Sequence, residues 1–250
     1  MKDSIKNNND DLIIGRNCVS EAIKSGREID SIFVSRGNKT GTVSAILAKA
    51  HQNNIPIKEV DSKKLDYMCG GAVHQGIIAR TAVKEYSSIE DIFSLAEERN
   101  EPPFIVILDE IEDPHNLGAI IRTGECAGIH GIIIPKRHSS GLTFTVNKAS
   151  AGAIEYIPIV RVTNIVSVIK ELKEKGVWIY AADMDGENIY SSDLTGSIAV
   201  VLGSEGKGIS RLVKENCDKI ISLPMKGKIN SLNVSVAAGI IMYEISKQRS

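Results

Sequence analysis

The strongest constraint on the fold is a series of short apolar runs that alternate with helical segments from residue 104 onward. Each run is almost continuously apolar, which is typical of strands in a parallel sheet that helices cover on both faces. Strands are predicted at residues 104–108, 131–134, 157–160, 178–182, 198–202 and 220–223, and helices at residues 117–127, 146–151, 165–175, 210–216 and 233–247. The alternation predicts an α/β domain with a parallel sheet over residues 104–250.

A second, smaller α/β module is predicted over residues 12–81. Strands are expected at residues 31–34, 57–60 and 76–81, and helices at residues 17–25, 42–53 and 62–68. A module of about seventy residues is small but able to fold alone. Residues 82–103 are acidic and are predicted to form a linker, with a helical turn or more around residues 89–95. The linker ends in Pro102-Pro103, and a proline pair cannot lie inside a helix or a central strand. Residues 1–11 lack an apolar core, which predicts a disordered tail and excludes a signal peptide.

The charge of the chain is unevenly distributed, although its net value is only −1. Residues 12–81 carry ten Lys and Arg against six Asp and Glu, a balance of +4, whereas residues 82–103 carry two against six. A basic module of this kind is compatible with a polyanionic partner but does not require one.

The composition disfavours several other classes of protein. No apolar run approaches the roughly 18 residues of a membrane span. The four cysteines lie far apart and form no Cys-x-x-Cys pair, which indicates reduced thiols and makes disulfides or a zinc site improbable. We therefore expect a cytoplasmic protein without a membrane segment and without a bound metal.

The stretch 220–241 joins the last predicted strand to the last predicted helix through a polar loop. Pro224 has no N–H group for a ladder hydrogen bond and therefore ends the strand. Ser231 and Asn233 are good N-cap residues, so free backbone N–H groups collect where the loop meets the helix. The stretch is interpreted either as a ligand-binding junction or as a capped core helix and nothing more.

A glycine-rich turn follows the fifth strand predicted after residue 104, with the sequence Leu202-Gly203-Ser204-Glu205-Gly206-Lys207-Gly208-Ile209-Ser210. Its position differs from that of a dinucleotide-binding turn, which follows the first strand, and its spacing differs from that of a P-loop. Three glycines allow close approach of the backbone to a ligand. Glu205 would repel a phosphate, so a neutral or cationic ligand is favoured. The alternative is an acidic turn that caps a helix at Ser210.

Three stretches together resemble the motifs of the SpoU (TrmH-like) RNA 2'-O-ribose methyltransferases of the SPOUT superfamily. Residues 116–122, Asn-Leu-Gly-Ala-Ile-Ile-Arg, resemble the first motif. The glycine-rich turn at residues 202–210 resembles the second motif, and residues 223–235 resemble the third. The motifs occur in the family's order and at similar spacing.

The resemblance extends over the rest of the ordered chain. Residues 12–81 are similar to the L30e-like substrate-binding domain of the family's longer members. Residues 113–116, Asp-Pro-His-Asn, and residues 148–153, Lys-Ala-Ser-Ala-Gly-Ala, are most similar to the enzymes that methylate a guanosine in 23S ribosomal RNA. A transfer RNA methyltransferase of the same family and a non-catalytic RNA-binding protein are the alternatives.

The resemblance implies a fold and an assembly that pattern rules alone would not predict. It implies a deep trefoil knot in the parallel-sheet domain, although true knots are very rare. It also implies a homodimer in which the first motif of one subunit meets the knot of the other, with large-subunit ribosomal RNA as the partner.

The resemblance further implies a cofactor and site residues. S-adenosylmethionine is the implied cofactor, and its implied contacts are Leu202, Gly203, Gly208, Leu223, Met225, Leu232 and Asn233. The implied catalytic residues are Asn116, Arg122, Glu205, Ser231 and Asn233. In the family an arginine that matches Arg122 is proposed to take the 2'-hydroxyl proton. Arginine is a poor base because its guanidinium stays protonated, so a clamp on an RNA phosphate that stabilises developing charge is favoured here.

Residues outside the motifs are interpreted from their type and position. Four cationic side chains are candidates for contact with RNA, namely Arg16, Arg36, Arg137 and Lys148. Trp178 and Tyr190 are interpreted as packing residues.

Overall fold

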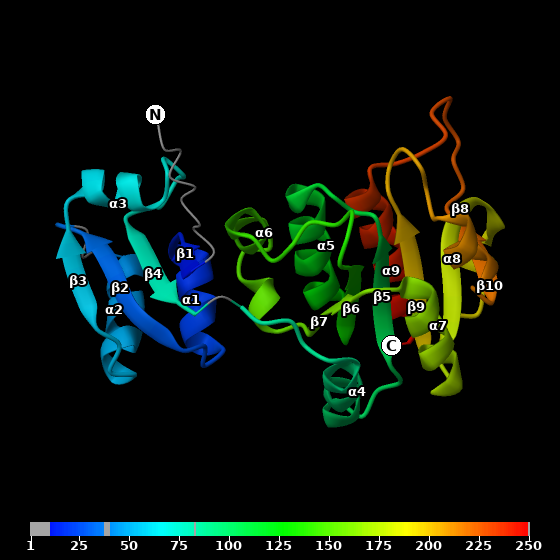
Figure 1. Ribbon diagram of the computed structural model, residues 1–250, viewed down its shortest axis with the longest axis horizontal. Helices are drawn as coiled ribbons and strands as arrows, with labels where there is room; N and C mark the ends of the chain where they lie inside the picture. Colours follow the sequence, from blue (N-terminus) through cyan, green and yellow to red (C-terminus); the bar gives the residue numbers. More distant parts are fainter. Residues whose placement is uncertain (1–10, 38–40, 83, 250) are drawn as a thin grey trace. The chain divides into compact units, whose positions relative to one another are not determined.

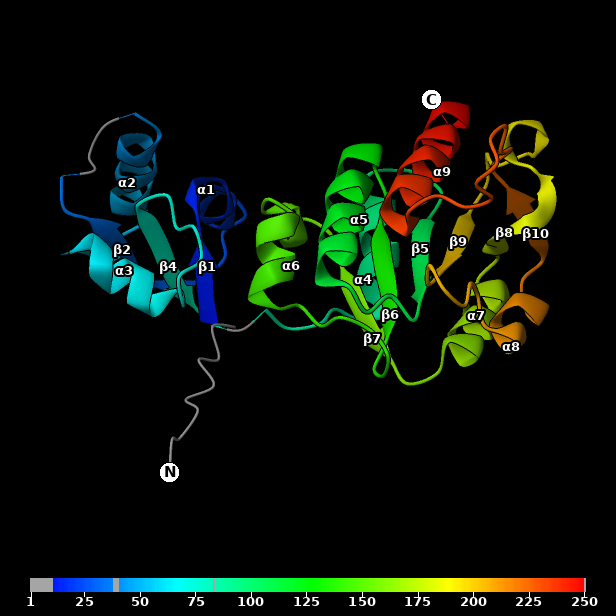
Figure 2. The same ribbon diagram turned by 90° about the horizontal axis from the view of Figure 1, so that it is seen from above.

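The computed structural model describes residues 11–37, 41–82 and 84–249. The chain forms two compact units (Figures 1 and 2). The first comprises Met1–Glu85 and Gly141–Tyr156, and the second comprises Tyr86–Ser140 and Ile157–Ser250. The predicted tail, residues 1–11, lies outside the described residues except for Asp11.

A four-stranded mixed sheet forms the centre of the first unit. Its strands are β1 (Leu12–Ile14), β2 (Ile29–Ser35), β3 (Ile57–Val60) and β4 (Ile77–Thr81), in the order β1-β4-β2-β3. β4 runs antiparallel to β1 and β2, and β3 runs parallel to β2. Successive residues of β2 alternate between the two faces, so Ile32 belongs to one apolar cluster and Phe33 to another.

Helices cover both faces of this sheet. α1 (Arg16–Lys24) and α2 (Thr42–Gln52) contribute to the cluster around Ile32, and α3 (Ser62–Met68) contributes to the cluster around Phe33. Both clusters are rich in Ile, Val and Leu, which explains how a module of this size buries enough apolar surface to fold.

Residues 141–156 belong to the first unit although residues on both sides of them belong to the second. They form α6 (Phe144–Ala149) and the short 3-10 turn η2 (Ala153–Glu155). The carboxylate of Glu155 is almost fully buried and lies 2.6 Å from the guanidinium of Arg27. The Tyr156 hydroxyl donates to Glu21 at 2.7 Å. The chain therefore crosses between the units three times.

A six-stranded sheet forms the centre of the second unit. Its strands are β5 (Phe104–Asp109), β6 (Gly131–Pro135), β7 (Ile159–Val162), β8 (Trp178–Asn188), β9 (Ile198–Gly203) and β10 (Lys219–Ser222). Their order is β10-β8-β9-β5-β6-β7, and every neighbouring pair is parallel. The predicted parallel α/β architecture is confirmed.

The six-stranded sheet is covered on both faces (Figure 2). α5 (Pro114–Ala127) and α9 (Val234–Gln248) pack against each other on one face. α4 (Ile89–Glu98), α7 (Ile165–Glu174) and α8 (Arg211–Glu215) lie on the other, where Ile92, Ile169 and Val213 join a cluster with Ile105 and Ile107 of β5. Burial on both faces explains why the strands read as continuous apolar runs.

β8 leaves the sheet in its middle. Tyr180 and Ala181 pair with the first residues of β10, and the next paired residue of β8 is Glu187. Residues 182–186 therefore bulge out of the ladder, and we call them the β8 excursion. A Cβ atom on Gly186 would lie 2.5 Å from the backbone of Ile221, so only glycine fits where the excursion returns to the sheet.

Two interpretations of aromatic residues were wrong. Trp178 and Tyr190 were interpreted as packing residues, but each is 54% exposed. Trp178 is the first residue of β8 and lines a surface cavity, and Tyr190 lies in the 3-10 turn η3 (Ile189–Ser191). No helix in the described part of the chain is long and apolar enough to cross a membrane.

Candidate active site

A cavity of about 550 Å³ lies at the carboxyl ends of β8, β9 and β10. In parallel sheets this is the edge at which ligands bind. The β8 excursion, the glycine-rich loop after β9 and the segment that leads into α9 line this main cavity. Its apolar lining residues are Leu202, Ile221, Leu223, Met225, Leu232, Val234, Ala237 and Ile241.

The glycine-rich loop after β9 folds back on itself at the edge of the main cavity. The Gly208 N–H donates to the Ser204 carbonyl at 2.8 Å, which closes the loop. A Cβ atom on Gly203 would lie 2.1 Å from the carbonyl carbon of Gly208 and 2.2 Å from the nitrogen of Ile209. The loop therefore closes only if residue 203 is glycine.

Three side chains that are far apart in sequence form a hydrogen-bonded group, which we call the polar triad: Asn116, Glu205 and Asn233. The amide nitrogen of Asn116 donates to Glu205 Oε1 at 3.2 Å. The amide nitrogen of Asn233 donates to Asn116 Oδ1 at 3.0 Å and also to Glu205 Oε1. The triad brings one residue of each predicted motif to one point.

Helix starts position two members of the triad. Asp113 caps α5 by accepting from the His115 N–H at 2.8 Å, and Asn116 follows in the first turn. Asn233 caps α9, because its Oδ1 accepts from the N–H of Ser235 at 2.9 Å. With its oxygen committed to the cap, the side-chain amide of Asn233 has only its nitrogen available for the triad.

Glu205 has no cationic partner within ion-pair distance in the described part of the chain. Its hydrogen-bond donors there are the amides of Asn116 and Asn233 and the Val234 N–H at 3.4 Å. Lys207, two residues along the loop, pairs with Glu110 at 3.3 Å. The environment of Glu205 therefore suits a cationic ligand group.

A smaller cavity of about 310 Å³ shares Ser204–Lys207 and Val234 with the main cavity. Its remaining lining residues are Glu110, Ile111, Glu112, Asp113 and Asn116. The polar triad therefore lies where the two cavities adjoin.

Arg122 is the one predicted catalytic residue that neither belongs to the triad nor lines one of the two cavities beside it. It is exposed on α5, and it lines neither the main nor the smaller cavity. No ion pair of its guanidinium is found among the described residues. A single chain therefore presents Arg122 to its surroundings and not to its own cavity.

The other predicted residues are placed as follows. Six of the seven predicted cofactor contacts line the main cavity: Leu202, Gly203, Gly208, Leu223, Met225 and Leu232. The seventh, Asn233, is the cap of α9 and a triad member. Ser231 also lines the main cavity but makes no contact with the triad in the hydrogen bonds found.

The predicted RNA contacts are divided between the two units. Arg16, Arg36 and Lys148 lie in the first unit and Arg137 in the second. The Arg16 side chain is held by a hydrogen bond, because its Nε donates to the Gln75 carbonyl at 3.1 Å. Arg36 is exposed and lies 3.6 Å from Asp61. Lys148 and Arg137 are exposed.

Sequence reasoning missed a charged pair in the main cavity. Asp183 of the β8 excursion lies 2.9 Å from the ammonium of Lys214 on α8, and both residues line the cavity. No motif covers either residue. The only available signal was the run Asp-Met-Asp-Gly directly after an apolar strand, at the edge where ligands bind.

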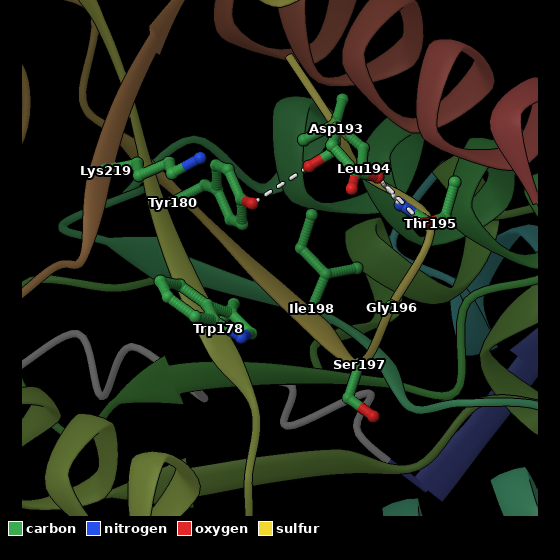
Figure 3. A pocket seen from close by; sticks show the side chains of 9 residues that line it. All are labelled: Trp178, Tyr180, Asp193, Leu194, Thr195, Gly196, Ser197, Ile198 and Lys219. Carbon is green, nitrogen blue, oxygen red and sulfur yellow. Dashed lines mark hydrogen bonds between the residues drawn. The ribbon is translucent and has the colours of Figure 1, made fainter.

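A third cavity, of about 280 Å³, lies at the opposite edge of the sheet, where β8, β9 and β10 begin (Figure 3). Trp178, Tyr180 and Lys219 line it, and the Tyr180 hydroxyl donates to the Asp193 carbonyl at 2.9 Å. The edge where the strands begin does not carry the ligand sites of parallel sheets. Among the described residues, no group of three or more His, Cys, Asp or Glu side chains is arranged to hold a metal ion.

Comparison with known sequences gives the same family over both units. The sequence model described as the SpoU rRNA Methylase family matches residues 103–243. The model described as RNA 2'-O ribose methyltransferase substrate binding matches residues 12–87. The Bacillus subtilis protein YacO, named as a TrmH family tRNA/rRNA methyltransferase, is 48% identical over 241 residues, which are 96% of each chain.

Solved structures of RNA-modifying enzymes are also similar to this chain. An AdoMet-bound rRNA methyltransferase from Sinorhizobium meliloti is 25% identical with a TM-score of 0.76, and the match covers 94% of this chain and 86% of that one. The A. aeolicus TrmH/SpoU tRNA modifying enzyme is 31% identical with a TM-score of 0.54, and the match covers 64% of this chain and 83% of that one.

Proposed function

The chain belongs to the SpoU rRNA methylase family and is an RNA methyltransferase that uses S-adenosylmethionine, and we propose that it methylates the 2'-oxygen of a guanosine in large-subunit ribosomal RNA in the cytoplasm. The observation that carries the choice of ribosomal RNA is the extent of the structural matches. The match to the structure described as an rRNA methyltransferase spans 94% of this chain, whereas the match to the tRNA modifying enzyme spans 64%.

The first unit supports this proposal because it supplies what a 2'-O-methyltransferase needs to select one ribose among many. Residues 12–87 match a substrate-binding model, and residues 12–81 have a charge balance of +4. Phosphate contacts set the register of a protein on a nucleic acid before any base is read. We propose that Arg16, Arg36 and Lys148 make such contacts with a folded RNA that is recognised by shape.

The main cavity fits S-adenosylmethionine. Its volume of about 550 Å³ lies within the range of small-molecule sites, and its Leu, Ile, Val and Met side chains suit an adenine ring. We propose that the six lining residues predicted as cofactor contacts hold the adenosine. When bound, the cofactor supplies an electrophilic methyl group on a cationic sulfonium.

The polar triad is proposed to position the two reactants. Glu205, without a cation beside it, favours the sulfonium charge on its side of the main cavity. Asn116 lines the smaller cavity, where we place the target ribose. The hydrogen bonds among the triad hold these groups rigidly, and such positioning is the main contribution an enzyme makes to an in-line transfer. We propose that Ser231 orients the same groups from the cavity wall.

We further propose that the active site is completed by a second subunit. Arg122 is exposed and lines neither cavity of its own chain, so we propose a partner chain as the source of the arginine that stabilises the developing charge. α9 carries an exposed apolar stripe at helical spacing, in which Val236 is 51%, Ile240 37% and Tyr243 52% exposed. An isologous interface of α5 and α9 would cover this stripe.

The proposed interface predicts that one charge introduced on α9 separates the subunits. Ile240→Asp is expected to convert the dimer to monomers and to abolish methylation, because it buries an unpaired carboxylate in the interface. Leu212→Asp, which changes a 59% exposed residue on α8, is the control and should leave the dimer intact. Light scattering of both variants measures the outcome. A wild-type protein that is a monomer while active would refute the interface.

The path of the chain supports a knot. After β10 at the edge of the sheet, residues 223–233 pass the carboxyl ends of β8 and β9 and reach Asn116 above β5. On this route they share the main cavity with the β8 excursion and the glycine-rich loop. We propose that this segment threads those loops and forms the trefoil knot that the family resemblance implies.

Mass spectrometry of RNA from cells that lack the gene tests the proposed substrate. Ribosomal RNA of the large subunit is expected to lose one 2'-O-methylguanosine, while transfer RNA keeps all its methyl marks. Wild-type protein returned to these cells should restore the mark, and the Arg122→Ala variant should not. If a transfer RNA loses its mark and the ribosomal RNA keeps every one, the substrate is transfer RNA.

A further inference from the structure

Lys214 pairs with both acidic side chains of the β8 excursion in the main cavity, with Asp183 at 2.9 Å and with the more exposed Asp185 at 4.0 Å. The ammonium of Lys214 lies 2.9 Å from Asp183 Oδ2, and both side chains are mostly shielded from solvent. Burial alone raises the pKa of Asp183, but the hydrogen bond and charge of Lys214 outweigh it and lower the pKa below its ordinary value. Asp183 therefore stays ionised and only accepts hydrogen bonds.

The charges of the main cavity separate into two groups of different character. Glu205 has amide partners and no ion-pair partner among the described residues, whereas Asp183 pairs with Lys214. A cationic ligand group gains more from Glu205. A neutral group that donates hydrogen bonds gains more from Asp183, whose carboxylate has about four lone-pair sites and accepts from Lys214 and from the backbone N–H groups of Asp185 and Met184.

S-adenosylmethionine contains one neutral group of this kind, the pair of ribose hydroxyls. Two neighbouring O–H donors match a carboxylate acceptor at the end of a strand, and nucleotide-binding sheets use an acidic side chain for this purpose. Asp183 reaches the cavity because the β8 excursion turns out of the ladder directly after Ala181. β8 is separated from β5 by β9, so Asp183 lies about 10 Å across the sheet from the strand that leads to Asn116.

We propose that Asp183 binds the ribose 2'- and 3'-hydroxyls of the cofactor and that Lys214 is a positioning residue that fixes the Asp183 carboxylate. This assignment rests on the proposed location of S-adenosylmethionine in the main cavity. It leaves the cofactor's cationic groups to the side of Glu205.

Calorimetry with S-adenosylhomocysteine, its 2'-deoxy and 3'-deoxy analogues and 5'-methylthioadenosine tests the proposal. Asp183→Asn is expected to weaken S-adenosylhomocysteine binding by about tenfold or more, as hydrogen bonds to a charged acceptor require. It should weaken 5'-methylthioadenosine, which lacks the amino-acid tail, by the same factor. The deoxy analogues should bind wild-type protein weakly and lose little further affinity in the variant. Glu187→Gln, which removes one charge from the same strand outside the cavity, is the control and should bind every ligand like wild type.

The possible outcomes distinguish a wrong assignment of Asp183 from a wrong proposed function. If Asp183→Asn weakens S-adenosylhomocysteine but not 5'-methylthioadenosine, Asp183 binds the tail and the assignment is wrong. If the losses from the variant and from the missing hydroxyl multiply, the two groups do not interact, and the assignment is again wrong. If wild-type protein binds none of the ligands, the proposed function and the Asp183 assignment both fail. An unchanged melting temperature of the unliganded variant excludes loss of folding as the cause.

Discussion

Replacement of Arg122 by alanine is expected to lower the rate of RNA methylation by about 10²–10³, the usual loss when one donor that stabilises developing charge is removed. The same variant should bind S-adenosylmethionine like wild type, because Arg122 does not line the main cavity. It should also keep its stability, since the side chain is exposed and has no ion pair among the described residues. Single-turnover transfer of a labelled methyl group to ribosomal RNA measures the first quantity, and calorimetry the second.

Two further substitutions test whether the loss of rate is specific to the guanidinium of Arg122. Arg211→Ala removes a guanidinium from the surface of the same unit, where it pairs at 3.7 Å with Glu215, and it should leave the rate unchanged. Arg122→Lys keeps the charge but loses the planar fork, so an intermediate rate is expected if Arg122 acts as a clamp. An Arg122→Ala enzyme with more than about a tenth of normal activity would remove Arg122 from the proposed mechanism.

Much of the fold was predictable because its signals are local. Five short apolar runs coincide with strands β5, β6, β8, β9 and β10, and the spacing of apolar residues located α2 and α7 within one residue of their ends. β1 was missed because Leu12–Ile14 is too short to show a period. The second half of β8 was missed because the residues after Ala182 are polar and leave the ladder.

The arrangement of residues 141–156 was not predictable from their own sequence. Glu155 is buried by a contact with Arg27, 128 positions away, and no local pattern specifies such a partner. This packing changes how the role of the first unit should be tested. Deletion of residues 1–90 would uncover the apolar side chains of α6, so charge substitutions at Arg16 and Arg36 are the cleaner experiment.

The candidate site was predicted from three sequence motifs, so site residues outside those motifs were missed. Asn116, Glu205 and Asn233 were named because each stands in a recognisable motif, and the structure brings them within hydrogen-bond distance. Asp183 and Lys214 stand in none, and only the bulge in β8 and the position of α8 place them in the cavity. The exposed position of Arg122 is a property of the fold that no residue type reveals.

Gly203→Ala is expected to abolish cofactor binding while the variant remains folded. The added methyl carbon would lie about 2 Å from the backbone of Gly208 and Ile209, where no side-chain rotation relieves the clash, so the loop that lines the main cavity must open. Gly196→Ala is the matched control. Gly196 precedes the same strand at its other end, and an added Cβ there meets nothing within 4 Å. Calorimetry with S-adenosylhomocysteine should therefore show binding to the control and none to Gly203→Ala, and binding to both would mean that the loop does not form the cofactor site.

Mixing the Arg122→Ala and Gly203→Ala variants tests whether the active site is shared between two subunits. If Arg122 of one subunit serves the cavity of the other, a mixed dimer of Arg122→Ala and Gly203→Ala chains contains one intact site, made from the cavity of the first chain and the arginine of the second. Random association makes half of the dimers mixed, each with one working site of two, so about a quarter of wild-type activity should return. A site built within one subunit cannot be rescued in this way, because one chain lacks the arginine and the other lacks the cavity. Activity after co-refolding that stays at the level of the separate variants would place Arg122 in its own subunit's site and contradict the proposed shared site.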